Sequence, residues 1–359
     1  MNIGVIGSGI AGLTAAWQLT RDGHRVTICE MRDRPALLAH TAHLRLDGRE
    51  RDIDSLLIWP KYHQGLVRFI DELGLNLRTR WFDSVTFFNE DDPKPYAGYR
   101  SKKVPLTKLN LLLPYGSTAI QSLGVCGFWL RKYLRAKLTH SSIGSRTTFG
   151  DYFDADTDPR YRTLLFPWVN CAIGFPYPEI MRRMPAMSII RFEIATLAHL
   201  PRMVDEGMTE MARRLADGAD LRLKHEIRSI EPSGEGVRVT GRVDDSEDFS
   251  ADFDRLVLAI PPKRIPQLVA DSSDEERRIW SSFQDSIANI YVHTDDRVMP
   301  HDREDWAAIL YRLRRDQSAQ VEFTVWTSRV GEFDTETQIF QSWNPVIMPA
   351  EDKILYRNQ

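Results

Sequence analysis

Cysteine is scarce in this 359-residue chain, and the three that occur, Cys29, Cys126 and Cys171, form no C-x-x-C pair. An odd number without that spacing excludes a disulfide framework and a cysteine-based zinc site, and it is typical of a protein from a reducing compartment. No apolar run reaches the ~18 residues that indicate a membrane-spanning helix. The amino terminus lacks the basic leader of a secretory signal peptide. We therefore expect a cytoplasmic protein without a transmembrane segment.

The chain also lacks an excess of charge of one sign. It has 47 Lys and Arg against 50 Asp and Glu, a formal net charge of −3, so nucleic acid is not an expected partner. One basic amphipathic stretch, residues 128–138, is the exception. It predicts either a peripheral membrane contact or, the interpretation we favour, a surface helix with a solvated basic face. The length allows one large or two medium domains.

The most informative pattern occupies residues 1–30. Residues 2–6 and 25–29 predict two short buried strands, and a helix between them ends at Gly23. The turn before that helix has the spacing G-x-G-x-x-G, and Glu30 follows the second strand, as the dinucleotide-binding βαβ fingerprint requires. The turn consists of Gly7, Ser8, Gly9, Ile10, Ala11 and Gly12.

Each glycine of this turn has a separate physical task. Gly7 permits the tight turn, Gly9 lets the backbone approach a pyrophosphate, and Gly12 allows the helix to pack closely on the strand. The N–H groups and the positive dipole end of the helix would then hold the phosphate charge. Glu30 can accept hydrogen bonds from a ribose and would repel a 2′-phosphate, so the pattern favours FAD or NAD over NADP.

Apolar periodicity and turn residues predict the remaining elements. Helices are expected at residues 62–73 (ending at Gly74), 118–140, 208–215 and 271–283. Strands are expected at 80–89, 221–224, 226–230, 237–240 and 256–260, with short strands within 44–53 and a turn at 90–95. After residue 283 the pattern alternates between strand and loop.

The histidines do not predict a metal site. His40 and His43 stand three residues apart, but no third ligand follows at a suitable spacing. We therefore expect both to be loop histidines and expect no metal. His293 is interpreted as a structural histidine whose hydrogen bonds are satisfied inside the protein.

Taken together, the chain resembles the amine-oxidase-type FAD-binding superfamily, which includes phytoene desaturases and protoporphyrinogen oxidases. It is most similar to bacterial proteins described as predicted NAD/FAD-binding or amine-oxidase-like, and the resemblance covers most of the chain. The segments that carry it are 7–30, Asp54 with Trp59-Pro60-Lys61-Tyr62, 227–261, His293-Thr294-Asp295 with Met299-Pro300, and Ser342-Trp343-Asn344-Pro345.

The resemblance implies an α/β fold, in which a Rossmann-like FAD/NAD(P)-binding domain is interrupted by an α+β substrate domain with a mixed sheet. We place the dinucleotide-binding domain at 1–80 and 201–265, the substrate domain at 81–200 and 266–345, and a C-terminal tail at 346–359. It also implies cofactor contacts beyond the turn. These involve Glu30 at the ribose, Met31 and Arg32 beside it, the backbone of Ile227 at the adenine, and Ala259.

Several glycines expected from the family pattern are replaced. An R-x-G-G element reads Arg34-Pro35-Ala36-Leu37-Leu38, a D-x-G reads Asp54-Ser55-Leu56, and a Gly-Gly before a helix reads Glu206-Gly207-Met208. The Gly-rich C-terminal flavin-binding motif of the family is also not found before Gln359. Because added side chains narrow a channel that glycines keep open, we expect an intact adenine half and an altered isoalloxazine half of the FAD site.

The resulting expectation is an FAD-dependent, amine-oxidase-like oxidoreductase. It would oxidise or desaturate a small-molecule substrate, lipid-like or a secondary metabolite, by hydride transfer to flavin, which needs no dedicated acid or base. No catalytic residue is assigned. Candidate pocket residues are mostly aromatic, because aromatic rings flank planar ligands well. They are Trp59, Tyr62, Trp168, Asn170, Phe175 and Tyr177.

Three alternatives remain open at this stage. The scaffold could serve a non-redox cyclase or isomerase. The flavin site could be completed by a second copy in a homo-oligomer or by a partner subunit. The cofactor could be NAD, or the chain could work with none.

Overall fold

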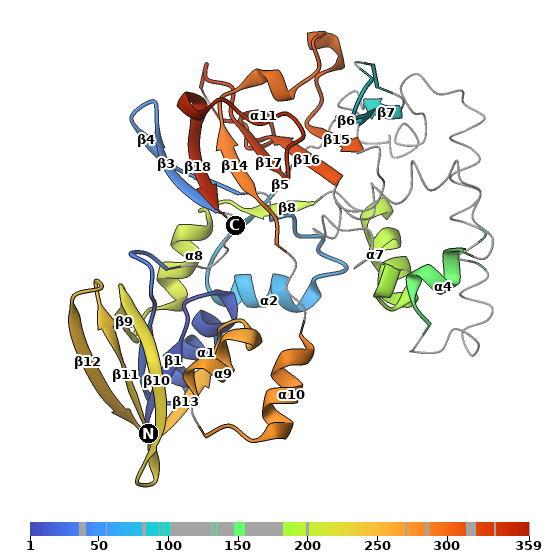
Figure 1. The fold of residues 1–359 in the computed structure, drawn as a ribbon. Coiled ribbons are helices and arrows are strands. Elements are labelled where there is room, and N and C mark those ends of the chain that lie inside the picture. Colours follow the sequence, from blue (N-terminus) through green and yellow to red (C-terminus); the bar gives the residue numbers. More distant parts are fainter. Residues whose placement is uncertain are drawn as a thin grey trace. The chain divides into compact units, whose positions relative to one another are not determined.

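The computed structural model describes residues 1–35, 41–54, 56–80, 84–92, 94–95, 97–100, 131, 134, 147–154, 182–198, 201–269, 271–283, 287–313, 321–333 and 335–358. They form two compact units, whose elements are labelled in Figure 1. Unit 1 contains residues 1–43, 69–76 and 204–286, and unit 2 contains 44–68, 77–203 and 287–359. These bounds differ from those expected for the dinucleotide-binding and substrate domains. The division of the chain into those two functional domains stays a prediction.

A four-stranded parallel sheet of order β13-β1-β2-β9 lies at the centre of unit 1 (Figure 1). β1 (Asn2–Ile6) and β2 (Arg25–Cys29) have the bounds expected from the sequence. β9 (Asp220–Arg222) and β13 (Arg255–Leu258) begin one residue before the predicted strands and end two residues before them. The last four residues of both β1 and β2 are buried, as strands of a parallel sheet covered on both faces require.

Helices of unit 1 follow the predicted apolar periodicity. α1 (Ile10–Arg21) joins β1 to β2 and packs against α8 (Met208–Leu215), whose bounds match the prediction. α2 (Gln64–Glu72) reaches into unit 1 and is followed by Gly74 at φ +68°. The expected helix at 271–283 is α10 (Asp274–Ser282), because Ser273 and Glu276 form a capping box that sets its start. Between β13 and α10 lie η2 (Pro262–Arg264) and α9 (Ile265–Leu268).

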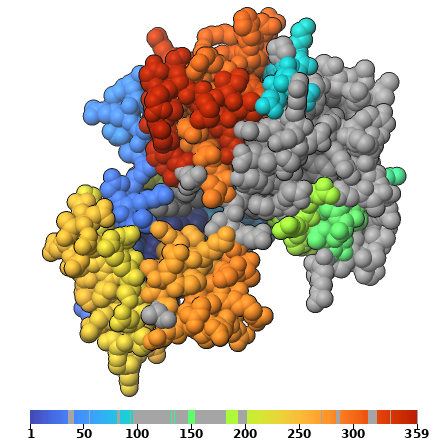
Figure 2. Space-filling view, in the orientation of Figure 1, coloured from blue at the N-terminus to red at the C-terminus, as the bar shows by residue number. Residues whose placement is uncertain are grey.

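A second, antiparallel sheet of unit 1 consists of β10 (His225–Ser233), β11 (Gly236–Val243) and β12 (Glu247–Phe253). Its atoms are yellow to gold in Figure 2. Ile6 and Cys29 of the parallel sheet share one hydrophobic cluster with Ile227 and Val239 of this sheet. Cys29 is 1% exposed, and burial raises the pKa of its thiol to about 11. The sequence did not predict β12, because charged residues interrupt its apolar ones.

Unit 2 is built on a seven-stranded mixed sheet of order β18-β14-β17-β16-β15-β6-β7. β6 and β15 are parallel, and the other neighbouring pairs are antiparallel. The strands are β6 (Ser84–Asn89), β7 (Ala97–Arg100), β14 (Ile290–His293), β15 (Ile309–Leu313), β16 (Val321–Trp326), β17 (Phe340–Trp343) and β18 (Ile354–Asn358). β18 lies within the residues that the sequence assigned to a C-terminal tail, and it pairs with β14.

Smaller elements complete the described part of the chain. Two-stranded sheets pair β3 (Ala42–Leu46) with β4 (Arg49–Ile53) and β5 (Leu77–Thr79) with β8 (Arg202–Val204). The other helices are α4 (Phe149–Asp154), α7 (Ala186–Ala198), α11 (Thr327–Val330), η3 (Asp296–Val298), η4 (Arg303–Asp305) and η5 (Glu351–Lys353).

Two sequence expectations need comment here. His43 was expected in a loop, which is wrong, because it lies inside β3 and pairing sets its conformation. The helix expected at 118–140 falls outside the described residues except at positions 131 and 134, so its alternative interpretations stay open. None of the helices that the structure describes is long and apolar enough to cross a membrane.

A chain of buried hydrogen bonds links four strands of the unit 2 sheet. The Asp295 backbone N–H donates to Nδ1 of His293 over 3.2 Å, so Nε2 carries the proton and donates to the Ser342 hydroxyl at 3.0 Å. The chain continues to Thr324 and ends at Glu322, which forms an ion pair with Arg312. His293, Ser342, Thr324 and Glu322 are fully buried, which confirms the structural role expected for His293.

The His293 environment predicts a pH dependence of stability. Burial lowers the pKa of His293 to about 4, against an ordinary value near 6.5. As the pH falls, His293 therefore binds a proton in the unfolded chain before it does so in the folded protein. The free energy of unfolding consequently decreases between about pH 6.5 and about pH 4, by a total on the order of 3 kcal/mol. Urea unfolding of wild type and His293→Gln at pH 7.0 and 5.0 measures this effect. The variant should lose less stability between these two values, and equal losses would contradict the assignment.

Candidate functional site

The glycine turn after β1 has a backbone that only glycine fits at two positions. Gly7 adopts φ +98°, and a Cβ there would lie 2.6 Å from the Ala259 carbonyl oxygen. A Cβ on Gly12 would lie 1.9 Å from the carbonyl oxygen of Gly7. These distances are far below van der Waals contact, so both glycines are required by the fold itself, where the first turn of α1 approaches β1 and β13.

Gly9 differs from its two neighbours in the motif. It is the N-cap of α1 with φ −66° and ψ 172°, an extended conformation that any residue adopts. Its backbone geometry therefore does not demand glycine. In the dinucleotide-binding motif, glycine at this position lets the bare backbone approach a pyrophosphate closely, and this role of Gly9 stays a prediction.

The start of α1 is suited to an anion. No side chain caps it, and its first turn contains no acidic residue. The first N–H groups of a helix have no partner inside the helix, and the helix dipole places partial positive charge there. This helix begins directly after the carboxyl end of β1, which is where parallel α/β sheets bind phosphate groups.

Glu30 holds the turn in place from the end of β2. Its side chain is 5% exposed. One carboxylate oxygen accepts hydrogen bonds from the Ser8 backbone N–H at 2.9 Å and the Ser8 hydroxyl at 2.7 Å, and the other accepts one from the Arg32 N–H at 3.0 Å. A carboxylate has about four acceptor positions, so capacity for a further donor remains. Ribose binding by Glu30 stays a prediction.

The other residues expected at the cofactor also belong to unit 1. Ala259 donates its N–H to the Ile6 carbonyl, which sets β13 beside the glycine turn. Ile227 lies in β10 immediately before a register shift, and its side chain is buried in the core. Met31 is half exposed, and the Arg264 guanidinium contacts its sulfur. The structure thus gathers the predicted nucleotide residues at the carboxyl end of β1 and β2.

Among the predicted pocket residues, Trp59 and Tyr62 lie together in unit 2. Both contact Phe192 of α7 edge-to-face, with ring centroids 5.3 Å and 5.0 Å away. His63, which sequence reasoning missed, packs against Tyr62 at 4.9 Å. The signal was its position four residues after Trp59, immediately before α2. The other predicted pocket residues, Trp168, Asn170, Phe175 and Tyr177, lie outside the described residues.

Asp54, in the segment that replaces the D-x-G element, is a perturbed carboxyl group of unit 2. Its side chain is half-buried, and one oxygen accepts the Leu56 N–H at 3.0 Å. Enough protein surrounds the carboxyl group that desolvation raises its pKa to about 7, despite the opposing effect of that hydrogen bond. Part of the Asp54 population is therefore protonated at neutral pH.

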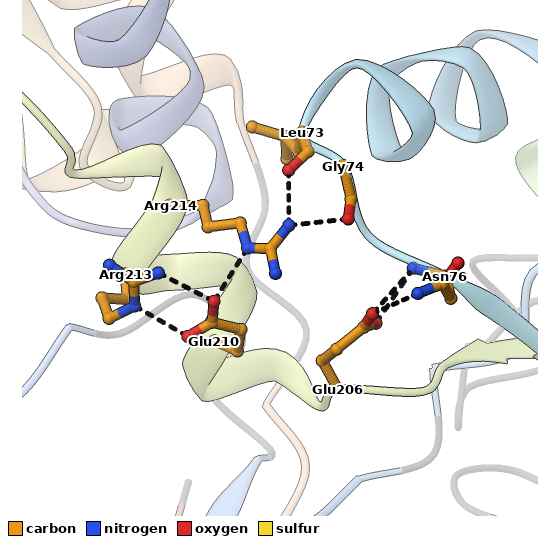
Figure 3. Close-up of polar contacts among 7 residues, drawn as sticks. All are labelled: Leu73, Gly74, Asn76, Glu206, Glu210, Arg213 and Arg214. Carbon is orange, nitrogen blue, oxygen red and sulfur yellow. Dashed lines mark hydrogen bonds and ion pairs between the residues drawn. The ribbon is translucent and has the colours of Figure 1, made fainter.

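The replacement of Gly-Gly by Glu206-Gly207 creates a polar clamp inside unit 1, drawn in Figure 3. Both carboxylate oxygens of Glu206 accept from the Asn76 backbone N–H, and one accepts from its side-chain amide at 2.7 Å. Gly207 keeps the positive φ of +87° that favours glycine. Met208 is 2% exposed and belongs to the core of α8. Glu206 and Met208 thus have structural roles within unit 1, and the expected narrowing of a flavin channel by this segment stays a prediction.

Arg214 extends the same clamp to the end of α2 (Figure 3). Its guanidinium donates to the carbonyl oxygens of Leu73 and Gly74 at 2.8 and 2.7 Å, and to Glu210 at 2.8 Å. These two carbonyls follow the last turn of α2, where helix carbonyls lack partners within the helix. Arg213 also pairs with Glu210, and the two guanidinium groups lower the pKa of that carboxylate to about 2. Among the described contacts of these two arginines, only those of Arg214 also reach the carbonyls that follow α2.

The pair of arginines provides a matched test of this clamp. Arg214→Ala should lower the free energy of unfolding by about 1–3 kcal/mol, because two carbonyl oxygens lose their donor. Arg213→Ala should have little effect, because its side chain is 66% exposed and contacts only Glu210 among the described residues. Urea unfolding monitored by tryptophan fluorescence measures both. Equal effects of the two substitutions would contradict the assigned role.

Comparison with known proteins adds family information to this geometry. Residues 10–332 match the family described as flavin containing amine oxidoreductase. No curated protein sequence gives a significant match. Within the part of the chain that the structure describes, no three potential ligands gather into a metal site.

Solved structures with a similar fold include three enzymes of different names. A cofactor-binding redesign of putrescine oxidase has a TM-score of 0.63 and 14% identity, covering 96% of this chain and 75% of that one. A putative protoporphyrinogen oxidase from Exiguobacterium sp. 255-15 has a TM-score of 0.61 and 15% identity, and the match covers 95% of this chain and 76% of that one. A CLA-producing fatty acid isomerase from P. acnes has a TM-score of 0.63 and 16% identity, and the match covers 98% of this chain and 79% of that one.

At these identities, the structures establish a shared fold, while the family match spans well over half of the chain. The family also accounts for the glycine turn, the uncapped start of α1 and the acidic residue after β2. The chain belongs to the flavin containing amine oxidoreductase family, whose cofactor is FAD.

Proposed function

We propose that this protein is an FAD-dependent oxidoreductase that oxidises or desaturates a small apolar or lipid-like molecule. The observation that carries the proposal is the turn from Gly7 to Gly12, with its uncapped helix start and Glu30 beside it. These residues fit the adenosine diphosphate part of FAD, because they offer backbone donors for two phosphates and a carboxylate for a ribose. In this proposal, unit 1 serves as the Rossmann-like nucleotide domain.

The roles of the individual groups follow from their chemistry. The N–H groups at the start of α1 would hold the pyrophosphate, and Gly9 would leave room for it. Glu30 would accept a ribose hydroxyl with the capacity that Ser8 and Arg32 leave free. When bound, FAD supplies a two-electron acceptor for hydride. The protein's own task is then to orient the substrate and exclude water.

The aromatic cluster of unit 2 supports an apolar substrate. It brings together four rings, those of Trp59, Tyr62, His63 and Phe192. Among the described residues, these four side chains make no hydrogen bond or ring contact that involves a carboxylate. A diamine such as the putrescine in the name of one similar structure has two positive charges, which bind best beside carboxylates. The substrate that fits this cluster is therefore apolar and uncharged or anionic. Oxidation would remove a hydride from one carbon and a proton from a neighbouring atom, which leaves a double bond.

A non-redox isomerase is the second candidate. One similar fold belongs to a protein named as a fatty acid isomerase, so this scaffold is compatible with rearrangement of a lipid. The two functions differ in the product. Mass spectrometry would show a loss of two hydrogen atoms after oxidation and an unchanged mass after isomerisation.

Substitution of Gly9 tests nucleotide binding separately from folding. Gly9→Leu should keep the fold, because the extended backbone at this position accepts any residue, but it should lower bound flavin by roughly tenfold or more. Absorbance near ~450 nm, divided by protein concentration, measures the flavin. Gly65→Leu is the matched control, since a Cβ there meets no atom within 4 Å.

The outcomes are distinct. Flavin in wild type and in Gly65→Leu, with little in a folded Gly9→Leu, supports the assignment. Flavin retained at the wild-type level by Gly9→Leu would reject the site, and a wild-type protein that takes up no FAD would reject the proposed function. Thermal unfolding of each variant establishes that it is folded.

A further inference from the structure

The residues around Trp59 form a cluster of four aromatic rings. Phe192, 2% exposed, lies at its base, and the rings of Trp59, Tyr62 and His63 surround it at centroid distances of 5.3, 5.0 and 6.5 Å. The four rings come from two segments of unit 2, the loop before α2 and helix α7. Trp59 is nearly buried, His63 is half-buried and Tyr62 is 40% exposed. The cluster therefore runs from the core to the surface.

The protonation of His63 is fixed by the backbone. The Trp59 N–H donates to Nδ1 of His63 over 3.1 Å. Nδ1 therefore acts as an acceptor, and in the neutral imidazole the proton is on Nε2. The His63 N–H also donates to the Trp59 carbonyl at 2.8 Å, and the His63 carbonyl accepts the Val67 N–H in the first turn of α2. These bonds hold the ring in one orientation, and burial lowers the pKa of His63, which keeps it neutral at pH 7.

The Nε2–H group of His63 has no acceptor among the described residues. The same holds for the Tyr62 hydroxyl and for the indole N–H of Trp59. Three donors without an acceptor among the described residues thus belong to one ring cluster, and within that part of the chain these rings contact no acidic side chain. A half-buried donor gains most from an acceptor that excludes water, and most of all from a charged one.

We propose that the Trp59–Tyr62–His63–Phe192 cluster is a binding subsite for an apolar small molecule with a carboxylate or carbonyl oxygen, which accepts a hydrogen bond from Nε2 of His63. The proposal rests on the proposed function, since it names the class of substrate. The rings take the apolar part of the molecule, and the oriented imidazole selects the oxygen. The side chains of Tyr62 and Trp59 are neutral hydrogen-bond donors. Because the donor set carries no fixed positive charge, it fits a neutral carbonyl oxygen as well as a carboxylate.

The test uses FAD-loaded protein and two probes of equal chain length, decanoate and decylamine. Isothermal titration calorimetry measures their dissociation constants. Wild type should bind decanoate more tightly than decylamine. His63→Phe keeps a ring of similar size but has no donor, so it should weaken decanoate binding by roughly tenfold or more, with a change of less than about twofold for decylamine.

Two further variants separate the hydrogen bond from packing and from general charge. His63→Gln retains an N–H donor and should bind decanoate with an affinity between those of wild type and His63→Phe. Lys61→Ala removes a nearby exposed positive charge and should leave the difference between wild type and His63→Phe intact. A large loss of decanoate binding in Lys61→Ala together with none in His63→Phe would overturn the proposal, because unspecific attraction would then explain the binding.

Flavin content, measured on the same samples by absorbance, separates this inference from the proposed function. A wild-type protein without flavin rejects the function. Three results with flavin-loaded protein would overturn the subsite and leave the proposed function standing. The wild type could prefer decylamine, it could bind neither probe, or His63→Phe could bind decanoate as tightly as the wild type does. If His63→Phe unfolds, decanoate binding to His63→Gln is compared with that to the wild type instead. The subsite is overturned if both His63→Gln and Tyr62→Phe bind decanoate with the wild-type affinity.

Discussion

The nucleotide site depends on one close approach between backbones. The first turn of α1 comes so near to β1 that a Cβ on Gly12 would lie 1.9 Å from the carbonyl oxygen of Gly7, and a Cβ on Gly7 would lie 2.6 Å from the Ala259 carbonyl oxygen. No side chain can occupy either place, and the helix start consequently points its N–H groups over the carboxyl end of the sheet. The motif thus carries a constraint of packing at Gly7 and Gly12, while access of a ligand stays the proposed reason for Gly9.

Local patterns allowed the sequence to predict this part of the fold closely. The bounds of β1, β2 and α8 match to the residue, because short buried strands and a strongly amphipathic helix leave little ambiguity. The mixed sheet of unit 2 could be inferred only from family resemblance. Its parallel pair joins β6 to β15, which are more than 200 residues apart, and such pairing is set by tertiary packing that no local pattern encodes.

The candidate sites show a similar division. The glycine turn and Glu30 could be read from residue type and spacing, and Trp59 and Tyr62 came from their aromatic character. His63 was missed because its significance comes from a backbone bond to Trp59 and from the ring of Phe192, which lies about 130 residues further along the chain. The replaced glycine at Glu206 illustrates a different limit. A family pattern marks where glycine is absent, but it cannot show that the new carboxylate turns toward Asn76.

The bonds between Glu30 and Ser8 have a consequence for the entropic cost of cofactor capture. A glycine-rich loop ordinarily samples many conformations, and a ligand must then select one of them at an entropic cost. Here a buried carboxylate accepts hydrogen bonds from the Ser8 backbone and hydroxyl, so bonds within the protein itself restrict the conformations of the turn. A turn ordered in this way would lose little entropy when the proposed nucleotide binds to it.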